Sequence, residues 1–581
     1  MKYRYYGTFA GIFSIILIIF ALLGTPNGDS TIFNLPWHVE FSRLLTSGIL
    51  FPKHSQDLAF GLGALDFFFY APLPFYITSI LGRLACIGCS ESAIFSVGGA
   101  WIWILSGLSM LYFTRRIFSE KIAIIVSICY VILPYHIATD WFIRQSFGEF
   151  AAYIFIPLIA SGLHDLAINR DGRFIFSIGT TGLLLTHLPS ALIAAFIFAI
   201  LFFASFIFFE KARHDQFIFF RRTAYCCALS AMISSFYWLP AISLLPTVSS
   251  DLLYTGHTIP KNWLAFCVSC ELSDYFLVST AIYFLPSIIV VILISRQKSL
   301  LRDRNCMFWV FLPIFLVLLM NTALSYPIWK YTILESVQFP WRMLVIADFS
   351  LAIGLGVLWS FKTDTKGKQV KHFSIFITIF SIIIVYISVY PRVLSSISGR
   401  MPNHAEIHMT SAPEYLPKNF GDYVDSWLKA RGHTHWSTHV FLEEIANEIK
   451  GRERGVTGIE RHYRRYDVTL DGTSEVILPI PYWSLMTAHG GTEPLRIVPT
   501  EEGLVSFDNR EGYTNLTIEI PLHGSEKVGN ALALIGLLLL AGLLFDKARR
   551  QRSEWRPVPA VEASRSQSGV GTKPTGTRDL S

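Results

Sequence analysis

Long apolar runs recur along the chain, each close to the length that a helix needs to cross a bilayer. A helix spanning the hydrocarbon core needs about 20 mostly apolar residues, and about twelve segments come close to that length. They are 7–24, 96–114, 121–138, 148–167, 174–188, 189–209, 223–245, 276–295, 306–323, 342–361, 373–391 and 529–546. Only 15% of the 581 residues are charged, whereas soluble domains carry about 25%. The sequence therefore predicts a polytopic α-helical membrane protein.

The segment 67–88 is apolar enough to be a thirteenth span, but the placement of basic residues argues against it. If it spans, the basic residues at 115–116 and 211–222 fall outside the cell, although Lys and Arg prefer cytoplasmic loops. If it lies in the interface, every basic cluster falls inside. Pro72 and Pro74 also suit a broken helix that does not span. We therefore expect both termini in the cytoplasm of a bacterium, with the chain in its inner membrane.

This topology divides the chain into four parts. Residues 1–391 form a transmembrane domain with a large first extracytoplasmic loop, 25–95, and residues 528–547 form a C-terminal transmembrane helix. Between them, 392–527 form an extracytoplasmic domain with a helix near 440–450. Strands follow at 465–470, 475–480, 495–498, 504–507 and 513–520, a pattern typical of a small β-sandwich. Residues 548–581 are rich in Ser, Thr, Gly, Pro and charge, which predicts a disordered tail.

Several short motifs occur in a characteristic order along the membrane part. They are Asn34-x-x-x-His38, Gly48-Ile-Leu-Phe-Pro52, Tyr70-Ala-Pro-Leu-Pro-Phe-Tyr76, Arg144-Gln-Ser-Phe-Gly-Glu149, Leu185-Thr-His-Leu-Pro189, Phe236-Tyr-Trp-Leu-Pro240 and Gln338-Phe-Pro-Trp-Arg342. With these motifs the chain resembles bacterial membrane proteins labelled as related to 6-pyruvoyl-tetrahydropterin synthase. Those proteins in turn resemble the GT-C glycosyltransferase superfamily, so a GT-C-like fold is expected.

The resemblance implies a polyprenyl-phosphate sugar donor, a reaction at the outer face and a catalytic Asp in the first outer loop. At the matching position this chain has Asn34, and an amide cannot take a proton from an acceptor hydroxyl at neutral pH. Either Asp29 or Glu40 has taken over the role of base, or this chain is not a transferase of that kind.

Glycosyl transfer from a lipid phosphate also needs cations to stabilise the leaving phosphate. Arg144 and Arg342 are the candidates, because guanidinium donates two parallel hydrogen bonds to phosphate. His38 would position donor or acceptor, and Asn34, Asp140, Glu149 and His187 complete the predicted substrate-binding set.

Structural roles compete with several of these assignments. Arg144 has Asp140 four residues earlier and could form a local ion pair, while Arg342 beside Trp341 could be an interfacial anchor. His187 could be a hydrogen-bonded interface histidine. Glu149 lies just inside a predicted span, where an ionisable group suggests function.

The cysteines and histidines of the outer segments offer further possibilities. Two Cys-x-x-Cys pairs are present, Cys86/Cys89 and Cys267/Cys270. An oxidising compartment favours disulfides, either between the two loops or within each pair, and the alternatives are reduced thiols or a four-thiolate zinc site. The run from His433 to His439 contains three histidines but no carboxylate or Cys at ligand spacing, so we predict no metal there.

Two functions remain open. The first is a membrane glycosyltransferase that moves a sugar from a polyprenyl phosphate to an extracytoplasmic glycan or glycolipid, with Asp29 or Glu40 as base. The second is a non-catalytic relative that binds lipid-linked glycan or scaffolds envelope polysaccharide assembly. A transporter fits less well, because no interrupted helices recur in two halves. The expected partners are lipid and glycan, not nucleic acid; no cofactor is certain, and assistance by a divalent metal is left open.

Overall fold

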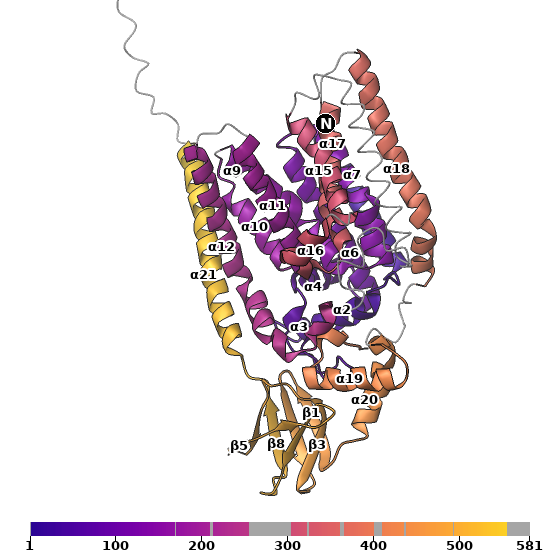
Figure 1. Cartoon of the computed structure of the whole chain (residues 1–581), viewed down its shortest axis with the longest axis vertical. Helices are drawn as coiled ribbons and strands as arrows, with labels where there is room; N and C mark the ends of the chain where they lie inside the picture. The colour runs from indigo at the N-terminus through magenta and orange to yellow at the C-terminus, as the bar shows by residue number, and fades with distance from the viewer. Residues whose placement is uncertain are drawn as a thin grey trace, which may run out of the picture.

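The computed structural model describes residues 2–168, 170–208, 213–254, 304–321, 325–360, 365–399, 409–434, 437–491 and 493–554. A bundle of helices forms one end of the molecule, and a small unit of strands with two helices forms the other (Figure 1). The N-terminus and the C-terminal end of α21 lie at the end opposite the strands (Figure 1). The protein is thus mostly helical, with a small β region near its C-terminus, as the sequence predicts.

The helices of the bundle come in long and short forms. The long ones are α1 (Lys2–Leu23), α2 (Thr31–Thr46), α6 (Glu91–Thr114), α7 (Glu120–Ile132), α9 (Phe155–Ala167), α10 (Arg173–Leu184), α11 (Leu188–Phe208), α12 (Arg213–Leu244), α15 (Arg304–Asn321), α17 (Leu344–Ser360), α18 (Thr365–Ser398) and α21 (Gly524–Glu554). The short ones are α3 (Asp66–Phe69), α4 (Leu73–Ile77), α5 (Arg83–Ala85), α8 (Phe147–Ala152) and α16 (Tyr326–Tyr331).

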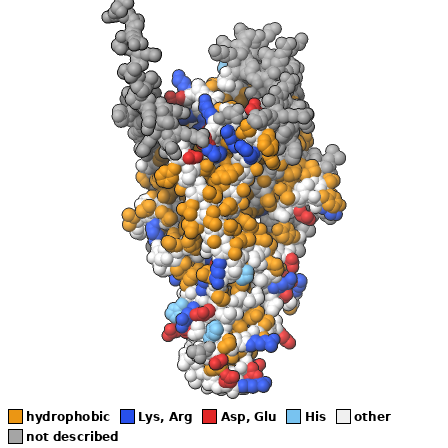
Figure 2. All heavy atoms as spheres, turned by 90° about the vertical axis from the view of Figure 1, so that its left-hand side faces the viewer, with side chains coloured by type: hydrophobic (Ala, Val, Ile, Leu, Met, Phe, Trp, Pro, Cys, Tyr) orange, Lys and Arg blue, Asp and Glu red, His pale blue; other side chains and the backbone are white. Residues whose placement is uncertain are grey.

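Seven helical segments among the described residues are long and apolar enough to cross a membrane. They are Glu91–Thr114, Glu120–Ile143, Phe147–Ala167, Asp215–Thr247, Pro340–Ser360, Ile375–Ser398 and Gly524–Asp546. Shorter apolar helices cover Phe13–Leu23, Leu73–Ala85, Arg173–Leu184, Leu188–Ile200 and Phe311–Met320. The expected span at 276–295 lies outside the described residues. On the face in Figure 2, apolar side chains form a broad band with charged ones gathered above and below it. The chain is therefore a multi-pass membrane protein.

The loop between α1 and α6, called here the first loop, folds into the bundle instead of projecting from it. Its aromatic residues Trp37, Phe41, Phe67 and Phe75 belong to the same buried core as the bundle helices. The apolar helix Leu73–Ala85 has 13 residues, so at 1.5 Å per residue it reaches about 20 Å, short of the ~30 Å hydrocarbon core.

Prolines and a π-helical stretch set the shape of that segment. Tyr70, before Ala71-Pro72, has extended backbone with ψ 134° and ends α3. Helix α4 then begins beside Pro74, continues through the π-helical turn Thr78–Gly82 and ends at α5. Directly after α5, Cys86 and Cys89 are joined to each other by a disulfide. The alternatives in which these two cysteines pair with the other loop or bind zinc are therefore not found, and Cys267 and Cys270 lie outside the described residues.

The end opposite the termini contains α19 (Lys418–Ala430), α20 (Thr438–Lys450) and eight strands. The strands are β1 (Val456–His462), β2 (Arg465–Leu470), β3 (Glu475–Pro481), β4 (Thr487–Gly490), β5 (Glu493–Leu495), β6 (Val498–Pro499), β7 (Leu504–Asp508) and β8 (Asn515–Glu519). They form two antiparallel sheets, β1-β2-β8-β4-β5 and β3-β7-β6.

Alternating burial explains why these strands form. In β2 the side chains of Tyr466, Val468 and Leu470 point inward, and their neighbours are less buried. The inward side chains of both sheets share one apolar core, which continues into Phe68, Tyr237 and Leu244 of the bundle. The strand unit is therefore packed against the first loop and α12. The sequence pattern located β2, β3, β7 and β8 but did not indicate β1 or β4. The expected strand 495–498 overlaps only the end of β5 and the start of β6.

Candidate functional site

The segment around Arg144 has unusual backbone geometry at the edge of a predicted span. Residues Tyr135–Ile143 form a π-helical stretch, closed by a hydrogen bond from the Arg144 N–H to the Thr139 carbonyl at 2.8 Å. Gln145 follows with φ +47°, a left-handed conformation that costs about 1 kcal/mol or more for a non-glycine residue. Its side chain is fully buried, and its amide has no hydrogen-bond partner within the described chain. Such a strained backbone conformation persists only where contacts with the surrounding structure stabilise it.

Hydrogen bonds from the start of the first loop stabilise this segment. The Asp29 and Ser30 N–H groups donate to the carbonyls of Ile143 and Arg144, both at 2.9 Å. The Asn34 side-chain amide donates to the Gln145 carbonyl at 2.7 Å and is itself 1% exposed. The predicted substrate-binding residue Asn34 therefore has a structural contact here, one that a carboxylate could not make because it has no proton to donate.

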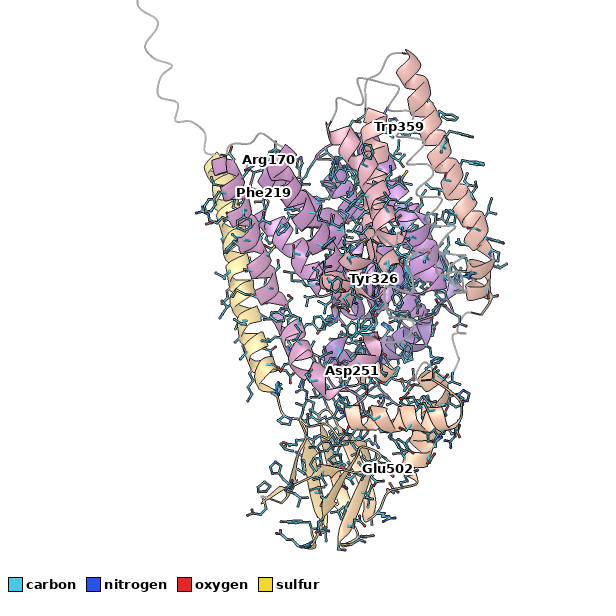
Figure 3. The ribbon with its side chains drawn as sticks, viewed as in Figure 1. Arg170, Phe219, Asp251, Tyr326, Trp359 and Glu502 are labelled. Atoms are coloured by element: carbon cyan, nitrogen blue, oxygen red, sulfur yellow. A yellow bond between two sulfur atoms is a disulfide. The ribbon has the colours of Figure 1, made fainter. Side chains whose placement is uncertain are left out.

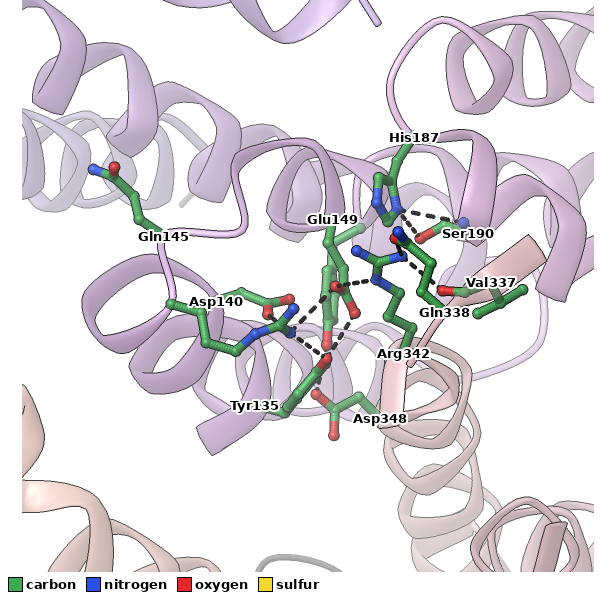
Figure 4. Close-up of polar contacts among 12 residues, drawn as sticks. Tyr135, Asp140, Gln145, Glu149, His187, Ser190, Val337, Gln338, Arg342 and Asp348 are labelled. Atoms are coloured by element: carbon green, nitrogen blue, oxygen red, sulfur yellow. Dashed lines mark hydrogen bonds and ion pairs between the residues drawn. The ribbon is translucent and has the colours of Figure 1, made fainter. Parts of the chain in front are cut away.

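Arg144 connects three oxygen-bearing side chains. Its Nη1 donates to the Tyr135 hydroxyl at 2.9 Å and lies 3.4 Å from Asp140 and 3.3 Å from Glu149 (Figure 4). The Tyr135 hydroxyl in turn donates to Glu149 Oε1 at 2.7 Å. The local ion pair with Asp140 thus exists, but it is one of several contacts of the guanidinium group.

Arg342 reaches the same carboxylate from another helix. Its Nε lies 3.7 Å from Glu149 Oε2, the oxygen that also faces Arg144 (Figure 4). Its Nη1 donates to the Val337 carbonyl at 2.7 Å and to Gln338 Oε1 at 3.0 Å, which fixes the guanidinium orientation. Two guanidinium groups therefore converge on one carboxylate oxygen, and we call Tyr135, Asp140, Arg144, Glu149 and Arg342 the arginine cluster.

Aromatic rings cover this cluster. Trp341 and Phe339 stack with ring centroids 4.5 Å apart. The Arg144 guanidinium lies 5.6 Å from the Trp341 ring and the Arg342 guanidinium 5.0 Å from the Phe339 ring, within the range of cation–π attraction. The arginine side chains keep 17% and 12% exposure, respectively. Both charges are therefore mostly desolvated.

Two further ionisable residues, Asp348 and His187, lie beside the arginine cluster. Asp348 on α17 accepts a hydrogen bond from the Tyr153 hydroxyl at 2.8 Å. Asp140 Oδ2 is buried without a hydrogen-bond partner among the described residues. His187 Nδ1 pairs with Ser190 Oγ at 2.7 Å, and its ring packs near Gly148, beside Glu149 (Figure 4). His187 is thus a hydrogen-bonded histidine at the edge of the cluster.

The other predicted residues lie apart from the arginine cluster. His38 Nδ1 pairs with Thr78 Oγ1 at 3.0 Å, and its Nε2 lies 3.7 Å from Glu91. Burial, with a smaller contribution from Arg83, lowers the pKa of His38 to about 3, so the ring is neutral. We therefore find no contact that would let His38 position a ligand on the arginines.

The two candidate bases have opposite surroundings. Both Glu40 oxygens are engaged, by Arg43 at 2.7 and 2.8 Å and by Ser55 at 2.8 Å, and the side chain is fully buried. Asp29 is exposed at the start of the first loop. Desolvation by nearby protein raises the pKa of Asp29, while the charges of Arg144 and Arg392 act in the opposite direction. Asp29 is the candidate base that is both accessible and electrostatically linked to the cluster.

The described residues contain no group of three or more His, Cys, Asp or Glu side chains arranged to hold a metal ion. His435, the middle histidine of the run 433–439, lies outside them. Sequence reasoning gave no role to Tyr135, Tyr153, Gln145 or Gln338. Gln145 and Gln338 belong to the motifs that contain Arg144 and Arg342, whereas Tyr135 and Tyr153 carried no signal of their own.

The fold and the arginine cluster define a class: a multi-pass membrane protein with a buried, charged site between its first loop and its helices. The chain matches no protein-family model and no curated protein sequence.

Proposed function

We propose that the protein is a membrane glycosyltransferase of the GT-C type that binds a polyprenyl-phosphate sugar at the arginine cluster. The single observation that carries the proposal is the convergence of Arg144 and Arg342 on one oxygen of Glu149. Two forked, partly desolvated cations facing one oxygen suit a phosphate group. The resemblance of the Arg144 and Arg342 motifs to that superfamily supports the same assignment.

The proposed reaction transfers the sugar between two oxygens. Asp29 takes the proton of the acceptor hydroxyl, and the acceptor oxygen forms a bond to the anomeric carbon of the sugar. The bond from that carbon to the phosphate oxygen breaks, and Arg144 and Arg342 stabilise the negative charge on the leaving polyprenyl phosphate. The contacts of Arg43 and Ser55 with both oxygens of Glu40 argue against Glu40 as the base.

On this proposal the acceptor is an extracytoplasmic glycan or glycolipid, and the protein lies in the inner membrane of a bacterium with both termini in the cytoplasm. The supporting observation is that the N-terminus and the C-terminal end of α21 both lie at the end of the molecule opposite the strand unit (Figure 1). The basic clusters between the apolar runs favour the same orientation.

A substitution pair tests the choice of base. Asp29→Asn removes the proton acceptor without changing side-chain size, and we expect loss of the dependent cell-surface glycan at normal protein level. Glu40→Gln breaks the pair with Arg43 and should lower the amount of folded protein while leaving transfer per folded molecule intact. Glycan that persists in cells with folded Asp29→Asn would contradict the catalytic proposal.

The second candidate, a non-catalytic binder of lipid-linked glycan, is favoured by one observation. Asn34, at the position where the resemblance implies the catalytic Asp, holds the Gln145 carbonyl with its amide. On this reading Asp29→Asn leaves the glycan unchanged, while Arg144→Gln and Arg342→Gln weaken the retention of polyprenyl phosphate in detergent-purified protein. Native mass spectrometry of the two arginine variants separates this reading from a protein that binds no phosphate.

A further inference from the structure

Lys53 is a buried cation that forms no ion pair with the described residues, and it lies outside the arginine cluster. It is only 5% exposed, and its Nζ makes no hydrogen bond or ion pair with the described residues. Three rings surround the ammonium group: Phe68 at 5.3 Å, Tyr237 at 5.7 Å and Phe236 at 6.0 Å from their centroids. These rings come from the first loop and from α12, so the cage forms only when the two pack together.

The aromatic cage does not neutralise the lysine. A cation–π contact returns only part of the free energy that is lost when an ammonium group is removed from water. Consistent with that cost, burial lowers the pKa of Lys53 to about 8. The group is therefore still largely protonated at neutral pH, and an anion beside it would stabilise it.

The carboxylate whose charge acts on Lys53, that of Glu526, is already engaged by another cation. Glu526 accepts two hydrogen bonds from Arg464, at 3.1 and 2.6 Å, and their side chains are 5% and 11% exposed. The Arg464 guanidinium lies 5.3 Å from the same Phe68 ring that faces Lys53. Glu526 thus balances Arg464, and the positive charge of Lys53 remains.

The neighbouring histidine adds no negative or positive charge. His54 Nε2 pairs with the Tyr466 hydroxyl at 2.9 Å, and its Nδ1 accepts the Arg464 N–H at 3.2 Å. Burial, and then the charges of Arg464 and Arg461, hold the pKa of His54 at about 3. The region is therefore net positive, with Lys53, Arg464 and Arg461 against Glu526.

Exposed apolar side chains belong to the segments that form this positive region. Phe51 is 58% exposed and contacts Phe236, while Ile242 on α12 is 63% exposed. Leu522, just before α21, and Val528, in its first turns, are 54% and 53% exposed. The region lies where α12 and α21 meet the strand unit (Figure 1). A cation beside exposed apolar side chains of a membrane protein has the chemistry of a lipid headgroup site.

We propose that Lys53 and the surrounding rings form a binding site for the phosphate of an anionic phospholipid, with the acyl chains lying against the exposed apolar residues of α12 and α21. The site holds the first loop, α12 and the strand unit together. It goes beyond the proposed transfer reaction and does not use the arginine cluster.

Lipid exchange in nanodiscs tests the proposal with a matched pair of variants. Lys53→Met removes the charge but keeps an unbranched side chain in the cage, and Lys330→Met does the same to an exposed lysine that also lies over two rings. Full-length protein from nanodiscs of phosphatidylglycerol and phosphatidylcholine is analysed by native mass spectrometry. We expect Lys53→Met to retain one fewer phosphatidylglycerol, with affinity reduced about tenfold, and Lys330→Met to match the wild type. Equal retention in Lys53→Met and wild type overturns the proposal.

Competition by phosphate and photocrosslinking of lipid test the same site in the wild-type protein. Inorganic phosphate at millimolar concentration is added to the wild type; displacement of the bound lipid would show that a soluble anion suffices and would overturn the headgroup assignment. A phosphatidylglycerol with a photoreactive group near its glycerol is crosslinked to the wild type, so that the test stands even if Lys53→Met does not fold. Adducts on residues 50–55 and 520–530 are expected, and their absence contradicts the site.

Discussion

Glu149 occupies the position that a ligand phosphate would need. Its Oε2 faces Arg144 at 3.3 Å and Arg342 at 3.7 Å, so a phosphate oxygen must displace it or share the two cations. We predict that Glu149→Gln raises the affinity for polyprenyl phosphate about tenfold, because the competing charge is removed. Binding to purified protein is measured by native mass spectrometry, with Glu91→Gln as a control glutamate that pairs with Arg83 instead. A lower affinity in Glu149→Gln would mean that Glu149 is an anchor of the site and not a competitor.

The Asn34 contact gives a second prediction. Asp at this buried position would place a carboxylate against the Gln145 carbonyl oxygen, with no proton to share. We expect Asn34→Asp to destabilise the protein by about 1–3 kcal/mol at neutral pH, measured as a lower midpoint in thermal unfolding. Asn447→Asp on the exposed face of α20 should have little effect. Normal stability together with increased sugar transfer in Asn34→Asp would restore position 34 as the site of the base.

At the residue scale, the sequence located the charged groups but not the groups that orient them. Glu149 was identified because an ionisable group just inside a span suggests function, and Arg144 and Arg342 because guanidinium groups suit phosphate. Tyr135, which bonds both Arg144 and Glu149, carries no such signal, because buried tyrosines are common in any core. Asp29 and Glu40 could not be ranked from sequence, since the ranking depends on Arg43 and Ser55 folding back onto Glu40.

At the scale of elements, the first loop is attached to the chain that follows α18 by a buried carboxyl group. Asp66 at the start of α3 accepts the Ser411 hydroxyl at 2.8 Å. Burial raises the pKa of Asp66 to about 7, against an ordinary value of 3.8, although the hydrogen bond from Ser411 opposes the shift. Between about pH 4 and pH 7, the folded protein therefore keeps the Asp66 proton, which the unfolded chain has already lost.

The contribution of Asp66 to the free energy of unfolding is fully present below about pH 4 and is lost as the pH rises towards 7. Asp66→Asn stays neutral at every pH, so its stability relative to the wild type should increase from pH 5 to pH 8. At about 1.4 kcal/mol per pKa unit the gain is on the order of a few kcal/mol. Thermal unfolding at both pH values measures it, with Asp422→Asn on exposed α19 as control. A pH-independent difference would mean that Asp66 is not protonated in the folded protein.

Elements with strong periodicity or length were predictable, and those made by tertiary contacts were not. The expected helix at 440–450 and the strand at 465–470 correspond to α20 and β2. Strand β4, by contrast, is four residues long and exists because it pairs with β8 and β5. The π-helical stretch Tyr135–Ile143 likewise has no predictive sequence pattern, since it depends on the contact of the first loop with Gln145.

At the scale of the whole molecule, the reaction proposed here requires the first loop and the strand unit to face the same compartment. They are joined by the Asp66–Ser411 contact and by the Tyr463 hydroxyl, which accepts a hydrogen bond from the backbone N–H of Lys53 at 3.1 Å. The short helix Leu73–Ala85 leaves this arrangement possible, because it does not reach across the bundle. Orientation in the membrane then decides whether the arginine cluster is open to lipid-linked glycans outside the cell.

Cysteine labelling tests that orientation directly. Arg170, which is exposed, lies at the end of the bundle that holds the N-terminus, and exposed Glu501 lies in the strand unit beside Glu502 at the other end (Figure 3). With the termini in the cytoplasm, a membrane-impermeant maleimide should label Glu501→Cys in intact cells and Arg170→Cys only after permeabilisation. Wild-type protein treated in parallel gives the background from native cysteines such as the exposed Cys227. Labelling of Arg170→Cys in intact cells would place the basic clusters outside and the first loop inside, where an extracytoplasmic acceptor could not reach Asp29.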